Sequence, residues 1–282
     1  MTTRPKIAFQ GEPGSFSNEA CAMYYPEHEP TAFADFEAAL EAVKTRKCEL
    51  GMIPVENSII GRQGDVHHLL PHSGLRIIGE RFKPIHFQLM AHPGVKLEDV
   101  RTVISMPFAA AQCRKLLRQL GVKLEPCADT AGSAKLLSEH FDPATAAIAP
   151  ALAAELYGLQ IIARDIEDEA HNTTRFIVLT ADPRPPAPPV GAPCVTSFTF
   201  RVRNLPAALY KALGGFATNG VNMTKLESYM ENGAFTATFF YSEVDGRPED
   251  PAVARAFEEI GFFCDHFEVL GVYPADPFRL SA

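Results

Sequence analysis

The chain has 282 residues, which corresponds to roughly two domains at about 150 residues each. Hydrophobic residues make up 46% and charged residues 21%, so the composition is globular and excludes a disordered or collagen-like chain. The net charge is −8 and no basic cluster is interleaved with aromatic residues, which argues against nucleic acid as a partner. Because the overall field repels anions, an acidic ligand would have to be held by local donors.

The sequence lacks the signals of secretion and membrane insertion. No run of about 18 apolar residues is present, and the N-terminus MTTRPKIAFQ has no apolar stretch of the signal-peptide kind. We therefore expect a cytoplasmic protein that binds no membrane. The cysteines have no Cys-x-x-Cys spacing, so we expect them to be reduced and to form no zinc framework; they are Cys21, Cys48, Cys113, Cys127, Cys194 and Cys264.

The N-terminal region alternates short apolar runs with helical patterns, which predicts an α/β fold with a mostly parallel sheet. The expected strands cover residues 6–10, 50–55, 76–80, 85–91, 101–105, 146–149 and 175–180. The expected helices cover residues 17–25, 35–46, 107–120, 130–140 and 150–157. The third helix opens with Pro107 and ends before Gly121, which are favoured positions for these residues. Ligands in such folds usually bind at the carboxyl ends of the strands.

A proline-rich stretch divides the chain. Residues 181–194, ADPRPPAPPVGAPC, hold six prolines, which permit neither a helix nor a central strand. We expect an extended linker over 182–194, between a first region at 1–181 and a second at 195–282. The second region alternates as strand, helix over 206–219, two strands around an Asn232-Gly233 turn, helix and strand. The order βαββαβ is that of the ferredoxin-like fold.

Three segments carry candidate functional residues. The loop from Gln10 to Ser17 leads into a helix whose N-terminus could bind an anion, although it could also be a simple turn with Ser17 as the cap. The segment from Pro54 to Ser58 ends an apolar strand, which suits substrate binding, but Asn and Ser also begin helices. The segment from Asn172 to Phe176 offers an arginine fork and a threonine hydroxyl, or forms a solvent-facing strand start.

The geometry of a regular strand limits what the third segment can do. Neighbours face opposite sides, so Thr174 and Arg175 share one cleft only if the backbone is irregular. His68 and His72 have the spacing of helical metal ligands, yet Pro71 interrupts the helix and no third ligand is evident beside them and His67, so we expect no metal. No Ser-His-Asp order or Gly-x-Ser-x-Gly is present, so an enzyme of this sequence would work by orientation and hydrogen bonding.

Taken together, five motifs resemble prephenate dehydratases in order and spacing: IAFQGEPGSFSNEA, GMIPVENSIIGRQGDV, SMPFAAAQC, AAIAPALAAELYGL and NTTRF. The later stretch NLPAALYKALGGFATNGVNMTKLES resembles an ACT domain, an amino-acid-sensing module. The resemblance spans residues 6–275. It implies a periplasmic-binding-protein-like catalytic region with one lobe at 1–80 and 160–181 and another at 81–159. It also implies the conversion of prephenate to phenylpyruvate in phenylalanine synthesis, without a metal or an organic cofactor.

The resemblance assigns roles residue by residue. Thr174 would donate or relay a proton to the leaving oxygen, and Arg175 would hold a carboxylate or order the turn. The other residues expected to bind substrate are Ser15, Phe16, Glu56, Asn57, Ser58, Thr130, Asn172 and Phe176. The residues expected to bind phenylalanine as an effector are Leu205, Ala207, Ala208, Leu209, Asn222, Glu227 and Ser228. Because ACT effectors usually bind between subunits, we expect a homodimer or a homotetramer.

Some positions depart from the family pattern. Met106 and Phe108 replace the histidine and glutamine of Ser-His-Pro-Gln. Ala207 replaces a glycine, which adds only a methyl group, and Tyr229-Met230 replaces Arg-Pro in the effector loop. These changes leave the strength and selectivity of phenylalanine binding open. Two other functions are also open: an arogenate dehydratase, since no group for an ammonium is evident, and a non-catalytic amino-acid sensor.

Overall fold

The computed structural model describes residues 4–230 and 237–280. Residue contacts divide the chain into two compact units: a first unit of Met1–Val66 and Phe82–Phe176, and a second of His67–Arg81 and Ile177–Ala282. The domain limits expected from the sequence stay a prediction. Within the described residues, no helix is both long and apolar enough to cross a membrane. All six cysteines lie in that part and are free, and burial raises the pKa of Cys264 to about 11.

The first sheet has the strand order β2-β1-β3-β11-β5, and a short β4 pairs with β3. Its strands are β1 (Lys6–Gln10), β2 (Glu29–Phe33), β3 (Leu50–Asn57), β4 (Gly61–Arg62), β5 (Arg76–Pro84) and β11 (Thr173–Thr180). The helices α1 (Phe16–Tyr24) and α2 (Phe36–Lys44) follow β1 and β2. Strand β1 runs parallel to β2 and β3. The strands at 6–10, 50–55, 76–80 and 175–180 were predicted, and β2 was missed.

The second sheet has the order β10-β6-β9-β7-β8. Its strands are β6 (Gln88–Ala91), β7 (Thr102–Ser105), β8 (Lys123–Pro126), β9 (Thr145–Ala149) and β10 (Gln160–Ala163). Strand β7 runs parallel to β8 and β9, whereas β6 runs antiparallel to both β9 and β10. The prediction of a mostly parallel sheet therefore holds for this sheet, with β6 as the exception.

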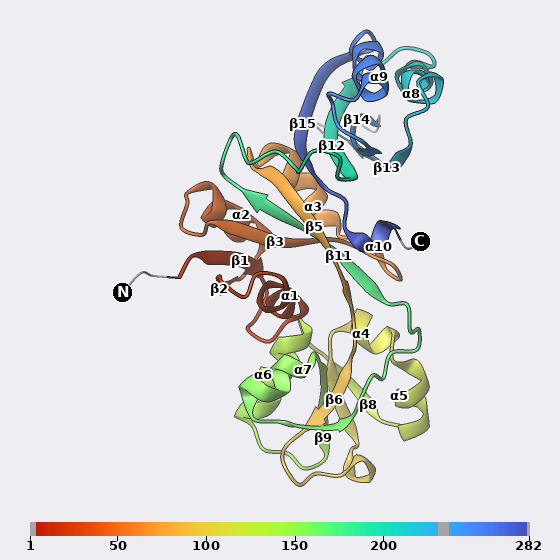
Figure 1. Cartoon of the computed structure of the whole chain (residues 1–282). Coiled ribbons are helices and arrows are strands. Elements are labelled where there is room, and N and C mark those ends of the chain that lie inside the picture. The colour runs from red at the N-terminus through yellow and green to blue at the C-terminus, as the bar shows by residue number, and fades with distance from the viewer. Residues whose placement is uncertain (1–3, 231–236, 281–282) are drawn as a thin grey trace. The chain divides into compact units, whose positions relative to one another are not determined.

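Helices cover both faces of the second sheet (Figure 1). Ala146 and Ile148 pack into the core beneath α4 (Pro107–Ala111) and α5 (Arg114–Leu120). Ala147 and Ala149 pack instead beneath α6 (Thr130–Glu139) and α7 (Ala151–Tyr157). Because successive strand residues face opposite sides, a strand with helices on both sides must be apolar throughout. This explains the uninterrupted apolar run in β9.

The single helix predicted over 107–120 was wrong. The structure ends α4 at Ala111 and starts α5 at Arg114, and Cys113 between them has a φ of −121°. The carboxylate of Asp168 accepts the main-chain N–H groups of Arg114 and Lys115 at 3.0 Å each. This distant side chain caps the second helix, and sequence periodicity gives no sign of it. Gly121 ends α5 as predicted, with a left-handed φ of 64°.

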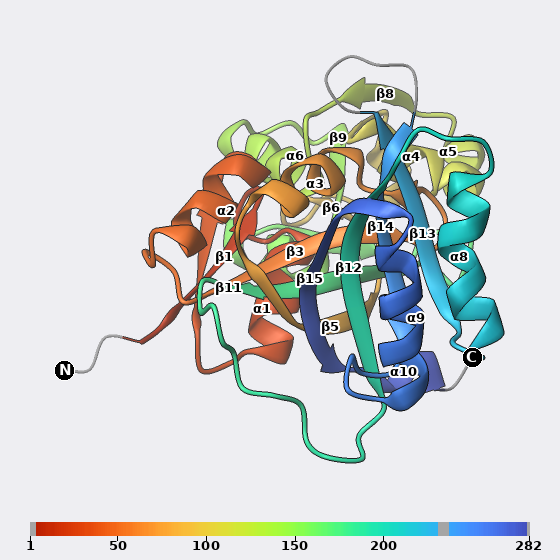
Figure 2. The ribbon, with the colours of Figure 1, turned by 90° about the horizontal axis from the view of Figure 1, so that it is seen from above.

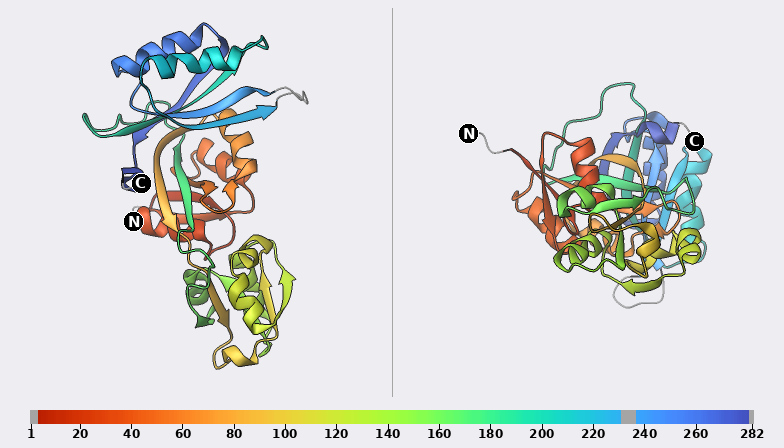
Figure 3. Two further views of the ribbon diagram at one scale, coloured as in Figure 1. Left: turned by 90° about the vertical axis from the view of Figure 1, so that its right-hand side faces the viewer. Right: turned by 90° about the horizontal axis from the view of Figure 1, so that it is seen from below.

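The second unit has the predicted element order βαββαβ. Its elements are β12 (Cys194–Val202), α8 (Ala208–Thr218), β13 (Met223–Met230), β14 (Ala237–Asp245), α9 (Pro251–Gly261) and β15 (Cys264–Pro274). The sheet order is β13-β14-β12-β15, and each pairing is antiparallel. Helices α8 and α9 lie side by side on one face (Figure 3), over a core that includes Phe198 and Phe200. The predicted Asn232-Gly233 turn lies outside the described residues.

The proline-rich stretch forms no regular element, as its prolines predicted. Residues 181–193 contain neither helix nor strand (Figure 2). Arg247 donates hydrogen bonds to the carbonyl oxygens of Pro188 and Pro189, so the stretch is fastened to the loop after β14. A proline carbonyl can accept such a bond although proline has no N–H to donate.

Two of the three clustered histidines pack against aromatic rings. His68, on α3 (Gly64–Leu69), meets the Tyr229 ring edge-on at 5.5 Å. His72, at the end of the short helix η1 (Leu70–His72), stacks on Phe239 at 6.0 Å. The side chain of His67 lies outside the described residues. The two described rings therefore contribute to the packing of the second unit.

A buried ion cluster ties the C-terminal helix α10 (Pro277–Leu280) to the sheet of the second unit. Arg279 donates to Glu80 at 2.6 and 3.0 Å and to Glu243 at 2.9 Å. Both carboxylates are fully buried. Tyr241 also donates its hydroxyl to Glu243, at 2.7 Å. One guanidinium thus donates to two buried carboxylates, and its planar fork suits carboxylate groups.

We expect Arg279→Ala to lower the free energy of unfolding of the second unit by about 3–5 kcal/mol, because it removes a cation that donates to two buried carboxylates. The matched control is Arg201→Ala, which breaks the half-exposed pair between Arg201 and Asp265 and should cost at most about 1 kcal/mol. Urea unfolding followed by circular dichroism measures both. Equal small losses in the two variants would contradict the role given to Arg279.

Candidate active site

The first unit contains a pocket of about 340 Å³, within the range of small-molecule sites. It opens where β1, β3 and β11 end or begin and where α1, α4 and α6 start. Its polar side chains are Gln10, Ser15, Ser17, Asn57, Gln63, Gln112, Asp129, Thr130 and Thr174. Its large apolar side chains are Phe16, Phe36, Ile60, Ile85, Phe87, Met106, Phe108 and Phe176. The wall is therefore largely aromatic, and apart from Asp129 its polar side chains are uncharged hydroxyls and amides.

Six of the predicted substrate and catalytic residues line this pocket: Ser15, Phe16, Asn57, Thr130, Thr174 and Phe176. Thr174 and Phe176 are two residues apart on β11 and so share a face. Arg175 does not line the pocket; its Nη1 donates to Glu56 Oε1 at 2.8 Å, and its guanidinium lies 5.9 Å from the Phe82 ring. Arg175 and Glu56 thus support β11 and β3 outside the pocket wall.

The Glu-Asn-Ser segment ends β3 and forms a turn, not a helix start. Asn57 Oδ1 accepts the main-chain N–H groups of Ile59 at 2.9 Å and Ile60 at 3.0 Å. The oxygen of the amide is thereby fixed, so the nitrogen must point the other way. Ser58 stands beside this turn, where its Oγ donates to the His171 carbonyl and accepts the Thr173 N–H.

The fixed orientation of the Asn57 amide determines which hydrogen bonds the hydroxyl of Thr174 can form. Asn57 Nδ2 donates to Thr174 Oγ1 at 3.0 Å and to Asn172 Oδ1 at 2.8 Å. A hydroxyl has one proton to donate, and here its oxygen already accepts a bond. The described residues offer that proton no acceptor, and the side chain lines the pocket. Thr174 is therefore set to donate a hydrogen bond to a ligand.

Three amide side chains, those of Asn57, Asn172 and Gln112, form a chain of hydrogen bonds along the pocket. Asn172 Nδ2 donates to Gln112 Oε1 at 2.6 Å, and Gln112 Nε2 donates to the Phe108 carbonyl at 3.1 Å. The hydrogen bonds thus fix the orientation of each amide group, from the Phe108 carbonyl at one end of the chain to the Thr174 hydroxyl at the other. Gln112 was not among the predicted site residues, although the motif SMPFAAAQC contains it.

The loop before α1 is held tightly. Gly14 has a φ of +90°, and a Cβ there would lie 2.9 Å from Ala153 Cα. Its N–H donates to Asn18 Oδ1 at 2.9 Å. Ser15, not Ser17 as the simple turn interpretation had it, is the N-cap of α1, because its Oγ accepts the Asn18 N–H. Ser17 instead contributes to the pocket wall.

Asp129 is the one charged side chain on the wall among the residues that the structure describes. It is the N-cap of α6 and accepts the Gly132 N–H at 2.6 Å. Thr130 is the first residue of this helix, which is where the helix expected over 130–140 begins. Lysines nearby are already paired: Lys83 with Glu19 at 2.8 Å, and Lys135 with Glu12 at 3.0 Å, a bond that raises the pKa of Lys135.

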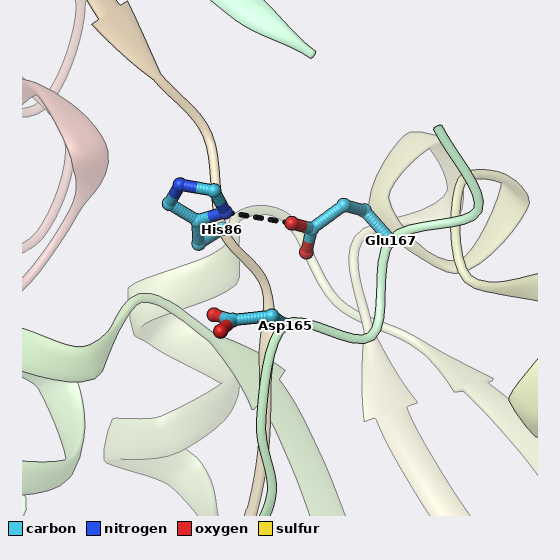
Figure 4. Close-up of side chains that lie close together, drawn as sticks. All are labelled: His86, Asp165 and Glu167. Carbon is cyan, nitrogen blue, oxygen red and sulfur yellow. Dashed lines mark hydrogen bonds and ion pairs between the residues drawn. The ribbon is translucent and has the colours of Figure 1, made fainter. Parts of the chain in front are cut away.

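One group of potential metal ligands occurs in the described part of the chain: His86, Asp165 and Glu167 (Figure 4). Glu167 accepts from His86 at 2.7 Å and from the Phe87 N–H at 2.9 Å. Asp165 accepts from the Gln88 side chain at 2.9 Å. Both carboxylates therefore fasten the segment after β10 to the segment before β6, and the group has a structural use without an ion.

Four of the predicted effector residues line a smaller pocket of about 230 Å³ in the second unit: Leu205, Ala207, Ala208 and Leu209. Asn222, Glu227 and Ser228 do not line it. Asn222 donates to Asp245 at 2.7 Å, and Glu227 pairs with Lys225 at 3.3 Å. Ala207 has a left-handed φ of 59°, so its methyl group is more than a small addition: a Cβ costs about 1–2 kcal/mol there.

Comparisons with known proteins agree on one family. A family model described as prephenate dehydratase matches residues 7–184. A bifunctional N-acyl-homoserine lactone acylase/prephenate dehydratase of Komagataeibacter europaeus is 47% identical over 97% of this chain and 97% of its own. Arogenate dehydratase/prephenate dehydratase 2 of Arabidopsis thaliana is 35% identical over 99% and 75%. The solved prephenate dehydratase of Arthrobacter aurescens in complex with L-Phe is 32% identical over 96% and 90%, with a TM-score of 0.85.

We expect Gly14→Ala to lower the free energy of unfolding of the first unit by about 2–5 kcal/mol, because the methyl group meets the α7 backbone in a left-handed conformation. Gly121→Ala is the matched control: its φ of +64° is also left-handed, but no atom lies near the added methyl, so only about 1–2 kcal/mol should be lost. Thermal and urea unfolding measure both. A Gly14 variant as stable as the Gly121 variant would refute the close contact.

Proposed function

Since the chain belongs to the prephenate dehydratase family, we propose that the pocket of the first unit converts prephenate to phenylpyruvate, carbon dioxide and water, as a step of phenylalanine synthesis. The observation that carries this proposal is the orientation of Thr174. Its oxygen accepts from Asn57, and its proton is left for a ligand in an aromatic pocket. The relatives named for prephenate dehydratase activity support the same reaction.

The proposed reaction needs little chemistry from the protein. The bond between the ring and its carboxylate breaks, the electron pair moves through the ring, and the ring hydroxyl leaves as water. Aromatisation drives both cleavages, so the step itself calls for no metal or organic cofactor. What remains is to hold the ring and to donate a hydrogen bond to the departing oxygen, where negative charge develops.

The residues of the pocket suit these two tasks. Phe16 and Phe87 meet edge-on at 5.3 Å and, with Phe176, provide flat apolar surfaces for a six-membered ring. Thr174 is a very poor acid, so it donates a hydrogen bond to the leaving oxygen and does not ionise. The proton that completes the departing water comes from solvent, directly or relayed through this hydroxyl. General acid assistance of this kind is worth about 10²–10⁴-fold in rate.

We expect Thr174→Ala to lower kcat by at least about tenfold with little loss of stability, whereas Thr174→Ser keeps a donor and most of the activity. Asn57→Asp should also lower kcat. The new carboxylate still accepts from Ile59 and Ile60, but it takes the proton of Thr174 for itself. Phenylpyruvate formed from prephenate is measured by its absorbance in alkali.

Three outcomes would each contradict one part of this proposal: the role of Thr174, the keto substrate or catalysis itself. Unchanged turnover in Thr174→Ala removes that hydroxyl from the reaction. Turnover of arogenate alone favours the arogenate dehydratase that the sequence left open. No turnover of either compound near neutral pH, with binding intact, favours the amino-acid sensor.

A second activity is tested with the same preparations. Met106 and Phe108 give the pocket an apolar side, and Phe108 is 56% exposed at its edge. Such a surface could hold an acyl chain, and the relative from Komagataeibacter europaeus is named for N-acyl-homoserine lactone acylase as well as prephenate dehydratase activity. Release of homoserine lactone from an N-acyl-homoserine lactone would support this activity.

We further propose that the second unit is an ACT domain that binds phenylalanine. Its element order and antiparallel sheet support this, as does the pocket that brings together Leu205, Ala207, Ala208 and Leu209. The Arthrobacter aurescens relative is described in complex with L-Phe. Strand β13 is an edge strand with exposed Leu226 and Met230, which supports a homodimer or a homotetramer.

We expect millimolar L-phenylalanine to raise the thermal midpoint of the full chain, because a ligand that binds only the folded state stabilises it. Ala207→Gly relieves the left-handed strain at the pocket and should raise the midpoint without ligand as well. L-Lysine is the control, since Arg203 lines this pocket, together with Asn204, Tyr210 and apolar residues, and would repel a second ammonium. No shift with phenylalanine would refute effector binding.

A further inference from the structure

The charge of the substrate pocket is unusual for a site that accepts a dianion. Its wall has no lysine or arginine in the described part of the chain, and one carboxylate, Asp129. Prephenate brings two carboxylates. Arogenate brings the same two carboxylates and an ammonium group in place of the keto oxygen. A wall with one negative charge therefore favours the amino compound on electrostatic grounds.

We propose that Asp129 is a specificity-determining residue that binds the ammonium group of arogenate, so that the pocket prefers the amino over the keto substrate. This inference rests on the proposed dehydratase function of the same pocket. Asp129 would then be the group for an ammonium that was not evident from the sequence.

The environment of Asp129 suits this role. Its Oδ1 accepts the Gly132 N–H at 2.6 Å, which fixes the carboxylate at the start of α6. A carboxylate offers about four lone-pair sites, so the fixed group can still accept from an ammonium. Its Oδ2 has no hydrogen-bond donor among the described residues. The capping bond holds the oxygens in place before a ligand arrives.

The neighbouring carboxylates are already engaged. Glu12 pairs with Lys135, Glu19 with Lys83, and Glu56 with Arg175. None of the three lines the pocket. Among the described residues, Asp129 is the one carboxylate that lines the pocket, and no cationic side chain pairs with it. An ammonium group of the substrate would supply that partner.

The test compares kcat/KM for arogenate and for prephenate in the wild type and in Asp129→Asn. Asparagine keeps the size and caps a helix as well as aspartate, so α6 is preserved. We expect kcat/KM for arogenate to fall about 10- to 100-fold, mainly through KM, as for a lost hydrogen bond to a charged group. The value for prephenate should stay the same or rise. Asp129→Ser provides a second neutral cap.

Glu12→Gln is the matched control, because it removes a nearby carboxylate that pairs with Lys135 off the wall, and the substrate ratio should not change. Calorimetric titration of both compounds separates the two proposals. If neither is turned over but Asp129→Asn weakens arogenate binding alone, the dehydratase function fails and the ammonium site stands. If both are turned over and the ratio is the same in Asp129→Asn, Asp129→Ser and the wild type, the site is refuted.

Discussion

The pocket of the first unit depends on the two main-chain N–H groups that Asn57 accepts. Because Ile59 and Ile60 occupy the amide oxygen, the amide nitrogen must face Asn172 and Thr174. A flipped amide would place the Asn57 N–H groups against those of Ile59 and Ile60 and would lose the hydrogen bonds on both sides of the amide. The threonine hydroxyl can then only donate outward. A local turn thus determines the direction of a proton more than a hundred residues away in sequence.

The hydrogen bonds that continue from Asn57 to Gln112 also depend on the break between α4 and α5. Gln112 can complete the amide chain because α4 ends just before it and its side chain returns to the Phe108 carbonyl. A continuous helix through this point would aim the side chain elsewhere. The break is stabilised by Asp168, which caps α5 with both oxygens and whose N–H donates to the Gln112 carbonyl at 2.6 Å. One connecting segment therefore holds the cap, the break and Asn172 together.

How well each strand could be predicted from the sequence depends on how deeply the strand is buried. The central strands have long apolar runs and were predicted. Of the missed strands, β2, β8 and β10 lie at sheet edges, and the two-residue β4 lies off the main strand order. Edge strands are half-exposed, so EPTAF and KLEP show no apolar run. The site residues could be found as motifs, but not their hydrogen bonds: Asn57 and Thr174 are 117 residues apart, and the backbone of Ile59 and Ile60 decides which atom faces which. The left-handed φ of Ala207 could likewise not be read from the sequence.

The placement of charge in the pocket matches what the proposed elimination requires. A lysine or arginine against the ring carboxylate would stabilise the reactant, from which the negative charge must leave. Uncharged donors bind a carboxylate with less loss of reactivity, because only interactions that strengthen in the transition state raise the rate. The charge moves toward the departing oxygen, and there the structure provides Thr174 as a fixed donor. Within the described residues, a pocket wall without lysine or arginine is therefore consistent with the proposed decarboxylation, in which Thr174 would donate to the departing oxygen.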